Sequence, residues 1–159
     1  MKTSVCSQLS IDFSIVSEVA LVYKNHVKPA DRPKISSSFE ASKLFRDCWD
    51  HTLEYCESFK ILLLSRANKV LGIATISTGG LAGTIADVRS IMQYALKANA
   101  HSIIAAHNHP SGNTQPSEAD KSLTKKIKDA GTLLDIPLLD HLIITPDNTY
   151  YSFADEGML

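Results

Sequence analysis

A short apolar run in the second half of the chain, HSIIAAHNHP at residues 101–110, ends in two histidines and a proline. Consecutive apolar residues over this length are typical of a strand buried on both faces in the middle of a sheet. A strand in the middle of a sheet needs a covering layer on each face, and helical patterns elsewhere in the chain can supply these layers. The run therefore predicts an α/β fold in which this strand is central and polar side chains gather where it ends.

The hydrophobic pattern elsewhere predicts the elements around this strand. We expect a first helix from Ser37 or Ser38 to about residue 52, a second after Asp87, and a third from about Ser117 to Gly131. Strands are expected at 14–24, as a pair within 59–78, and as a hairpin at 138–153, with loops at 25–38 and 78–83. The order β-α-β-β-α-β-α-β-β predicts a mixed β-sheet sandwiched by helices.

Length and composition limit the classes of protein to consider. The 159 residues, 44% hydrophobic and 21% charged, suit one compact domain, which we place at 38–159 after an N-terminal strand and loop segment at 1–37. The net charge of −1 argues against a broadly basic surface for nucleic acid. No apolar run is long enough to span a membrane, and the first residues are too polar for a signal peptide, so we expect a cytoplasmic protein.

The three cysteines are an odd number without a CxxC pair, which argues against a disulfide framework and against a cysteine-rich zinc site. Cys48 lies at helical spacing from Ala41, Leu44 and Phe45. We therefore expect Cys48 on the buried face of the first helix, as a small core residue.

His107 and His109 stand two residues apart, so an extended chain directs both imidazoles to the same side. Asp120 lies three residues before Leu123 and seven before Ile127 on the third helix, so it belongs to the apolar stripe of that helix. A carboxylate on an inward face is costly unless a partner satisfies it. Two histidines, an aspartate and one open position are a ligand set that suits zinc, which lowers the pKa of a bound water to about 7.

A simpler interpretation of the same residues stays open. Ser117 can cap the third helix, with Asp120 completing a capping box, while His107 and His109 are ordinary residues beside a turn.

Hydrolysis at such a metal also needs a general base. Glu57 is the candidate, because it shares one strand face with Phe59 by the period-two rule, and Glu54 in the preceding turn is a competitor. Asp140 and His141 open a later strand, where His141 is either a structural histidine or a residue that orients a ligand.

These motifs together resemble a known family. Glu57, His107-x-His109-Pro110 and Ser117-x-x-Asp120 resemble the signature of the JAMM (MPN+, or JAB) metalloproteases. The segments ESFKILLLSRANKVLG, HNHPSGNTQPSEAD, LLDHLIIT and YYSF are similar to the RadC-like branch, over about residues 38–154.

The resemblance implies a JAMM/MPN fold, related to the cytidine-deaminase-like folds, and a zinc ion bound by His107, His109, Asp120 and a water. It implies that Glu57 is the general acid/base and that Ser117 helps hold the oxyanion of a tetrahedral intermediate. The bond cut in such proteases is an amide, often an isopeptide bond to lysine. We therefore expect a zinc-dependent metallopeptidase with a peptide or isopeptide substrate.

RadC-like proteins usually carry an N-terminal helix-hairpin-helix region thought to touch DNA. Residues 1–37 show no pattern of tandem helical hairpins, so we expect this region to be lacking, which weakens the expectation of DNA as a partner.

Two other functions remain as alternatives. A metal-dependent nuclease or DNA-associated repair protein could use the lysines at 121, 125, 126 and 128, which equally suit the solvated face of a helix. A non-catalytic interaction module could keep zinc for stability, although structural zinc sites normally have four protein ligands. A zinc deaminase is excluded, because the chain has neither His-x-Glu nor Pro-Cys-x-x-Cys.

Overall fold

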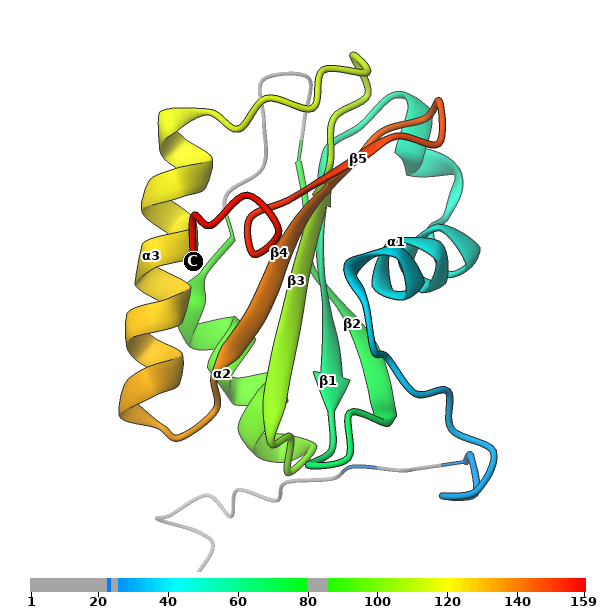
Figure 1. Ribbon diagram of the computed structural model, residues 1–159, viewed down its shortest axis with the longest axis vertical. Helices are drawn as coiled ribbons and strands as arrows, with labels where there is room; N and C mark the ends of the chain where they lie inside the picture. The colour runs from blue at the N-terminus through cyan, green and yellow to red at the C-terminus, as the bar shows by residue number, and fades with distance from the viewer. Residues whose placement is uncertain (1–22, 24–25, 80–85) are drawn as a thin grey trace, which may run out of the picture.

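The computed structural model describes residues 23, 26–79 and 86–159, which contain one mixed sheet and the helices packed on it (Figure 1). The five strands lie in the order β2-β1-β3-β4-β5. Along the chain the elements are α1 (Ser38–Asp47), the 3-10 helix η1 (His51–Glu54), β1 (Ser58–Leu64), β2 (Val70–Thr78), α2 (Val88–Lys97), β3 (Ser102–Asn108), α3 (Glu118–Leu133), β4 (Leu138–Ile144) and β5 (Tyr150–Ser152).

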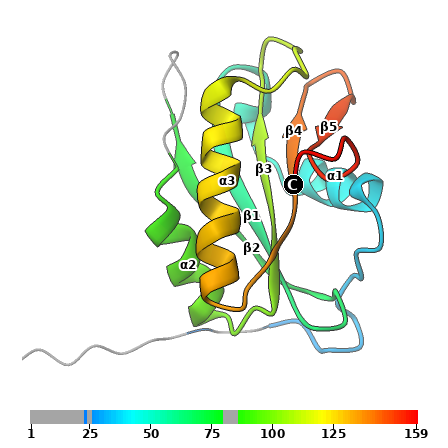
Figure 2. The same ribbon diagram turned by 60° about the vertical axis from the view of Figure 1, so that its left-hand side comes forward.

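Helices cover the sheet on both faces. Figures 1 and 2 show α1 on one face, and α2 and α3 together on the other. Two hydrophobic cores result, one under α2 and α3 around Ile61, Ile103 and Ile127, and one under α1 around Phe45 and Leu62. Every residue of β3 is buried, as the apolar run predicts for a central strand. The predicted mixed sheet sandwiched by helices is confirmed.

Strand pairing brings the end of β3 next to the start of β1. β3 is antiparallel to β1, with Phe59 opposite His107, and parallel to β4. The register of β3 on β4 shifts by one residue between Ile103 and Ile104, so that Ala105 lies opposite His141. Because side chains alternate between the two faces of a strand, this shift decides which residues of β4 face α3.

Helix α1 begins as predicted but ends earlier. The Ser37 hydroxyl accepts a hydrogen bond from the Glu40 amide at 3.2 Å, as an N-cap should. The helix ends at Asp47, so the helical spacing no longer applies at Cys48, which is the C-cap. Cys48 is exposed, and its predicted place in the core is wrong.

Helix α3 continues past Gly131, which was expected to end it. The chain leaves the helix at Asp135, whose φ is +56°, while the amide of Ile136 donates to the carbonyl of Gly131 at 2.8 Å. A β-carbon at Gly131 would lie only 2.4 Å from the carbonyl oxygen of Ile136. Glycine is therefore needed here for close approach of the backbone rather than for a left-handed conformation.

Some expected features lie outside the described residues. These are the strand at 14–24, apart from Tyr23, and most of the loop at 78–83. The division of the chain at residue 37 stays a prediction. Within the described ranges, the structure contains no helix of the length and apolar character needed to cross a membrane.

We predict that Gly131→Ala destabilises the protein although alanine normally favours a helix. The added methyl group meets the backbone of Ile136, so the free energy of unfolding should fall by about 1–3 kcal/mol. Urea denaturation measures the change. Gly72→Ala on β2 is the matched control, since its methyl group would meet nothing within 4 Å, and an equal loss in both variants would contradict the explanation.

Candidate metal centre

Three predicted ligands meet where β3 ends and α3 begins. His107 Nε2 lies 3.0 Å from His109 Nε2 and 3.3 Å from Asp120 Oδ1, and His109 Nε2 lies 3.9 Å from Asp120 Oδ2. One ligand atom from each of the three residues lies within 4.8 Å of the others. His107 comes from β3, His109 from the loop that follows, and Asp120 from the first turn of α3.

In both histidine ligands the Nδ1 atom, which faces away from the other ligands, is bonded to an acceptor. These acceptors decide where the ring protons are. His109 Nδ1 lies 2.7 Å from the carbonyl oxygen of Asn113. A carbonyl oxygen can only accept, so Nδ1 of His109 carries the proton and Nε2 presents a lone pair.

The proton on His107 is set by two further side chains. The hydroxyl of Thr124 donates its one proton to the carbonyl of Asp120 at 2.6 Å, so its oxygen accepts from Nδ1–H of His141, also at 2.6 Å. Complete burial lowers the pKa of His141 well below its ordinary value and keeps the ring neutral. Its Nε2 therefore accepts from Nδ1–H of His107 at 2.9 Å, which leaves Nε2 of His107 as a lone pair.

With both rings neutral, three acceptor groups thus converge. Lone pairs 3.0 and 3.3 Å apart repel one another unless a cation lies among them, either a proton on one histidine or a metal ion. Burial opposes ionisation of Asp120, yet the hydrogen bond and positive charge that a protonated His107 supplies, with hydrogen bonds from Ser117, hold the pKa of this carboxyl below its ordinary value. The carboxylate is therefore charged at neutral pH, as a metal ligand must be.

Ser117 forms the predicted capping box. Its hydroxyl oxygen accepts from the amide of Asp120 at 3.1 Å, and its own amide donates to Asp120 Oδ2 at 2.7 Å. The hydroxyl proton also goes to Oδ2, at 2.6 Å. Ser117 therefore holds one carboxylate oxygen, while the other, Oδ1, faces His107.

Glu57 lies one residue before β1. The pairing of Phe59 with His107, whose rings stack with centroids 6.2 Å apart, places the start of β1 beside the ligands. By strand alternation Glu57 belongs to the same face as Phe59. Among the described residues, Glu57 is not a member of the group that could hold the metal. Glu54 is an exposed residue of η1.

Comparison with known proteins agrees with this arrangement. Residues 35–158 match the family model of the RadC-like JAB domain. The chain belongs to the RadC-like JAB domain family. The predicted membership in the RadC-like branch is thereby confirmed.

Three relatives of this RadC-like domain carry the name "UPF0758 protein". One from Flavobacterium johnsoniae is 54% identical over 102 residues, which is 64% of this chain and 44% of the relative. One from Porphyromonas gingivalis is 50% identical over 103 residues (65% and 45%), and one from Desulfitobacterium hafniense is 38% identical over 133 (82% and 56%). The chain thus spans about half the length of the curated relatives it matches.

Thr124 is a residue of the RadC-like site that the sequence pattern did not indicate. It is buried on α3, one turn after Asp120, and its hydroxyl joins the backbone of Asp120 to the ring of His141. Its role depends on the contact with His141 of β4, which the local pattern around Thr124 does not reveal. The role of His141 as a histidine that orients a ligand was one of the two options predicted, and its hydrogen bond to His107 favours that option.

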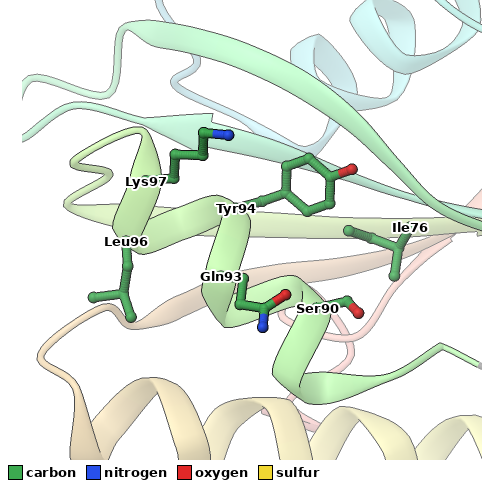
Figure 3. A pocket seen from close by; sticks show the side chains of 6 residues that line it. All are labelled: Ile76, Ser90, Gln93, Tyr94, Leu96 and Lys97. Atoms are coloured by element: carbon green, nitrogen blue, oxygen red, sulfur yellow. The ribbon is translucent and has the colours of Figure 1, made fainter. Parts of the chain in front are cut away.

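A groove of about 520 Å³ opens beside Asp120, between the start of α2 and α3. Its lining residues are Ala86, Asp87, Val88, Ala119, Asp120, Ser122, Leu123 and Lys126. A second groove, of about 560 Å³, lies on the outer side of α2, where Tyr94 and Lys97 point toward the strands (Figure 3). None of the residues lining the second groove is a candidate ligand, whereas the first groove is lined by Asp120.

We predict that the RadC-like domain binds one divalent ion per chain and that His109→Ala abolishes this binding. Removing one of three ligands leaves an incomplete set, whereas His101→Ala, an exposed histidine outside the group, should bind normally. Titration of metal-free protein with Zn²⁺ or Co²⁺ in a calorimeter measures both. Equal binding by wild type and His109→Ala would mean that the ion binds elsewhere and that a proton alone occupies the cluster.

We also predict that His141→Phe weakens metal binding by about 10- to 100-fold. The phenyl ring keeps the stacking on Phe153, whose centroid lies 4.9 Å away, but offers no acceptor to His107 Nδ1. Competition with a chelator measures the dissociation constant. Phe153→Leu is the control, because it disturbs the same stack without touching a hydrogen bond, and an equal effect there would contradict the role of the nitrogen.

Proposed function

We propose that this domain is a zinc-dependent hydrolase of amide bonds, a peptidase or isopeptidase. The observation that supports this most is the convergence of two imidazole lone pairs and a carboxylate beside a groove, with three protein ligands rather than four in the part of the chain that the structure describes. Three ligands leave a coordination position open for water or substrate, as in catalytic zinc sites. Membership in the RadC-like JAB domain family agrees with this proposal, while its relatives carry no activity in their names.

In this proposal His107, His109 and Asp120 would hold the zinc, which supplies a Lewis acid and makes water acidic enough to lose a proton at neutral pH. Glu57 takes a proton from the attacking water as the new C–O bond forms. It then delivers that proton to the amine nitrogen as the C–N bond breaks.

Ser117 donates a hydrogen bond to the oxyanion when the substrate is bound, in exchange for its bond to Asp120 Oδ2. The groove beside Asp120 admits the chain to be cut. Its apolar wall, formed by Ala86, Val88 and Leu123, suits aliphatic side chains or the methylene groups of an isopeptide-linked lysine.

The compartment of action is part of the proposal. We propose that the protein works in the cytoplasm, which agrees with the free thiols of Cys48 and Cys56. A DNA partner remains an alternative prediction from the lysines of α3, of which Lys121 pairs with Glu118 at 2.6 Å.

We predict that Glu57→Gln lowers kcat by about 100- to 10,000-fold while zinc content and thermal stability stay unchanged. A glutamine keeps the shape of the side chain but cannot take the proton. Hydrolysis of a panel of fluorogenic peptides and of peptides linked through a lysine side chain measures the loss.

Glu54→Gln is the matched control, because this exposed acid lies only three residues earlier. Loss of turnover in Glu54→Gln but not in Glu57→Gln would assign the base to Glu54. A wild-type protein that binds zinc and cuts nothing in the panel would favour the interaction module instead.

A further inference from the structure

Asn108 stands between the two histidine ligands but faces the opposite side of the sheet. Side chains alternate along β3, so His107 faces α3 whereas Asn108 faces the side of the sheet that carries α1 and η1. Asn108 is completely buried. A buried amide is costly unless all its polar atoms are bonded, so its partners indicate why it is there.

Among the described residues, the side-chain amide of Asn108 is bonded to backbone groups that lie before β1 or at its start. Its Oδ1 accepts from the amide of Ser58 at 2.7 Å. Its Nδ2 donates to the carbonyls of Cys56 at 2.9 Å and Leu53 at 3.0 Å. Because a backbone N–H can only donate and a carbonyl can only accept, this orientation of the amide is the one that satisfies every partner.

These partners lie on both sides of Glu57. Cys56 precedes it and Ser58 follows it, so one side chain binds the peptide groups that flank the glutamate. Glu57 itself lies before the β1 ladder, and its carbonyl accepts from the amide of Gly79 at 2.8 Å. The place of Glu57 relative to the metal ligands therefore depends on Asn108.

We propose that Asn108 is a positioning residue that holds Glu57 at a fixed place relative to His107 and His109. The proposal rests on the proposed function, in which Glu57 moves the proton. Asn108, which we call the clamp, lies directly between two of the ligands: His107 and Asn108 end β3, and His109 follows them. A shift of this segment therefore carries the glutamate with it. Base and metal site are thus kept in register without a direct contact between them.

The chemistry of the clamp requires asparagine. An aspartate at 108 would keep the acceptor for Ser58 but would turn a second oxygen toward the carbonyls of Leu53 and Cys56. A serine is too short to reach both sides of Glu57. We therefore expect Asn108→Ser to release residues 51–58 locally while the strands stay folded.

Hydrogen exchange followed by NMR tests the clamp without any substrate. In the wild type, the side-chain NH₂ protons of Asn108 and the amide of Ser58 should exchange slowly. In Asn108→Ser, exchange should rise at 51–58 and stay unchanged in β4. Fast exchange of the Asn108 side chain in the wild type would overturn the clamp, even if the variant does not fold.

A double-mutant cycle then tests the positioning role. Asn108→Ser should lower kcat by about 100-fold with little change in KM and in zinc content, as expected for a displaced base. In the Glu57→Gln background the same substitution should cost no further activity, because it acts through Glu57. Ile104→Val is the control for lost stability on the same strand and should leave kcat unchanged.

The outcomes are distinct. Equal losses from Asn108→Ser with and without Glu57 would overturn the positioning role and leave Asn108 a structural residue. If the wild type shows slow exchange at Asn108 and Ser58 but no hydrolysis, the proposed function fails, and the exchange data alone support the clamp.

Discussion

The hydrogen bond from His107 Nδ1 to His141 Nε2 joins the two central parallel strands at the point where the site begins. It is buried, and it fixes which nitrogen of His107 is left for a ligand. The bond depends in turn on Thr124, whose hydroxyl holds His141 and whose own proton goes to the backbone of Asp120. Strand β3, strand β4 and helix α3 are thereby connected through polar groups that each have one possible arrangement of protons.

Local sequence rules predicted the parts of the site that depend on neighbours along the chain. The capping box of Ser117 and Asp120 follows from a spacing of three residues, and the shared face of His107 and His109 follows from strand alternation. The hydrophobic pattern likewise predicted β3 as a central strand. In each case a few consecutive residues contain the whole physical cause.

Local rules could not choose between the two roles predicted for His141, structural or ligand-orienting, since the choice depends on a register between distant strands. Ile103 lies opposite Leu138, and an unbroken register would put Asp140 beside Ala105. The one-residue shift after Ile103 places His141 there instead and turns its ring toward α3. Cys48 shows a different limit of the local rules. Helical spacing predicts a buried face only for residues within the helix, and α1 ends one residue before Cys48.

The convergence of lone pairs has a cost that the rest of the fold must offset. Two imidazole nitrogens and a carboxylate without a cation among them repel, and folding alone brings them together. The central strand β3 can impose this arrangement because all its residues are buried, on both faces of the sheet. A cation that binds the folded site relieves the repulsion and binds the unfolded chain less well, so it must stabilise the fold. The close approach of the three ligand atoms therefore causes both the affinity for the ion and the repulsion in its absence.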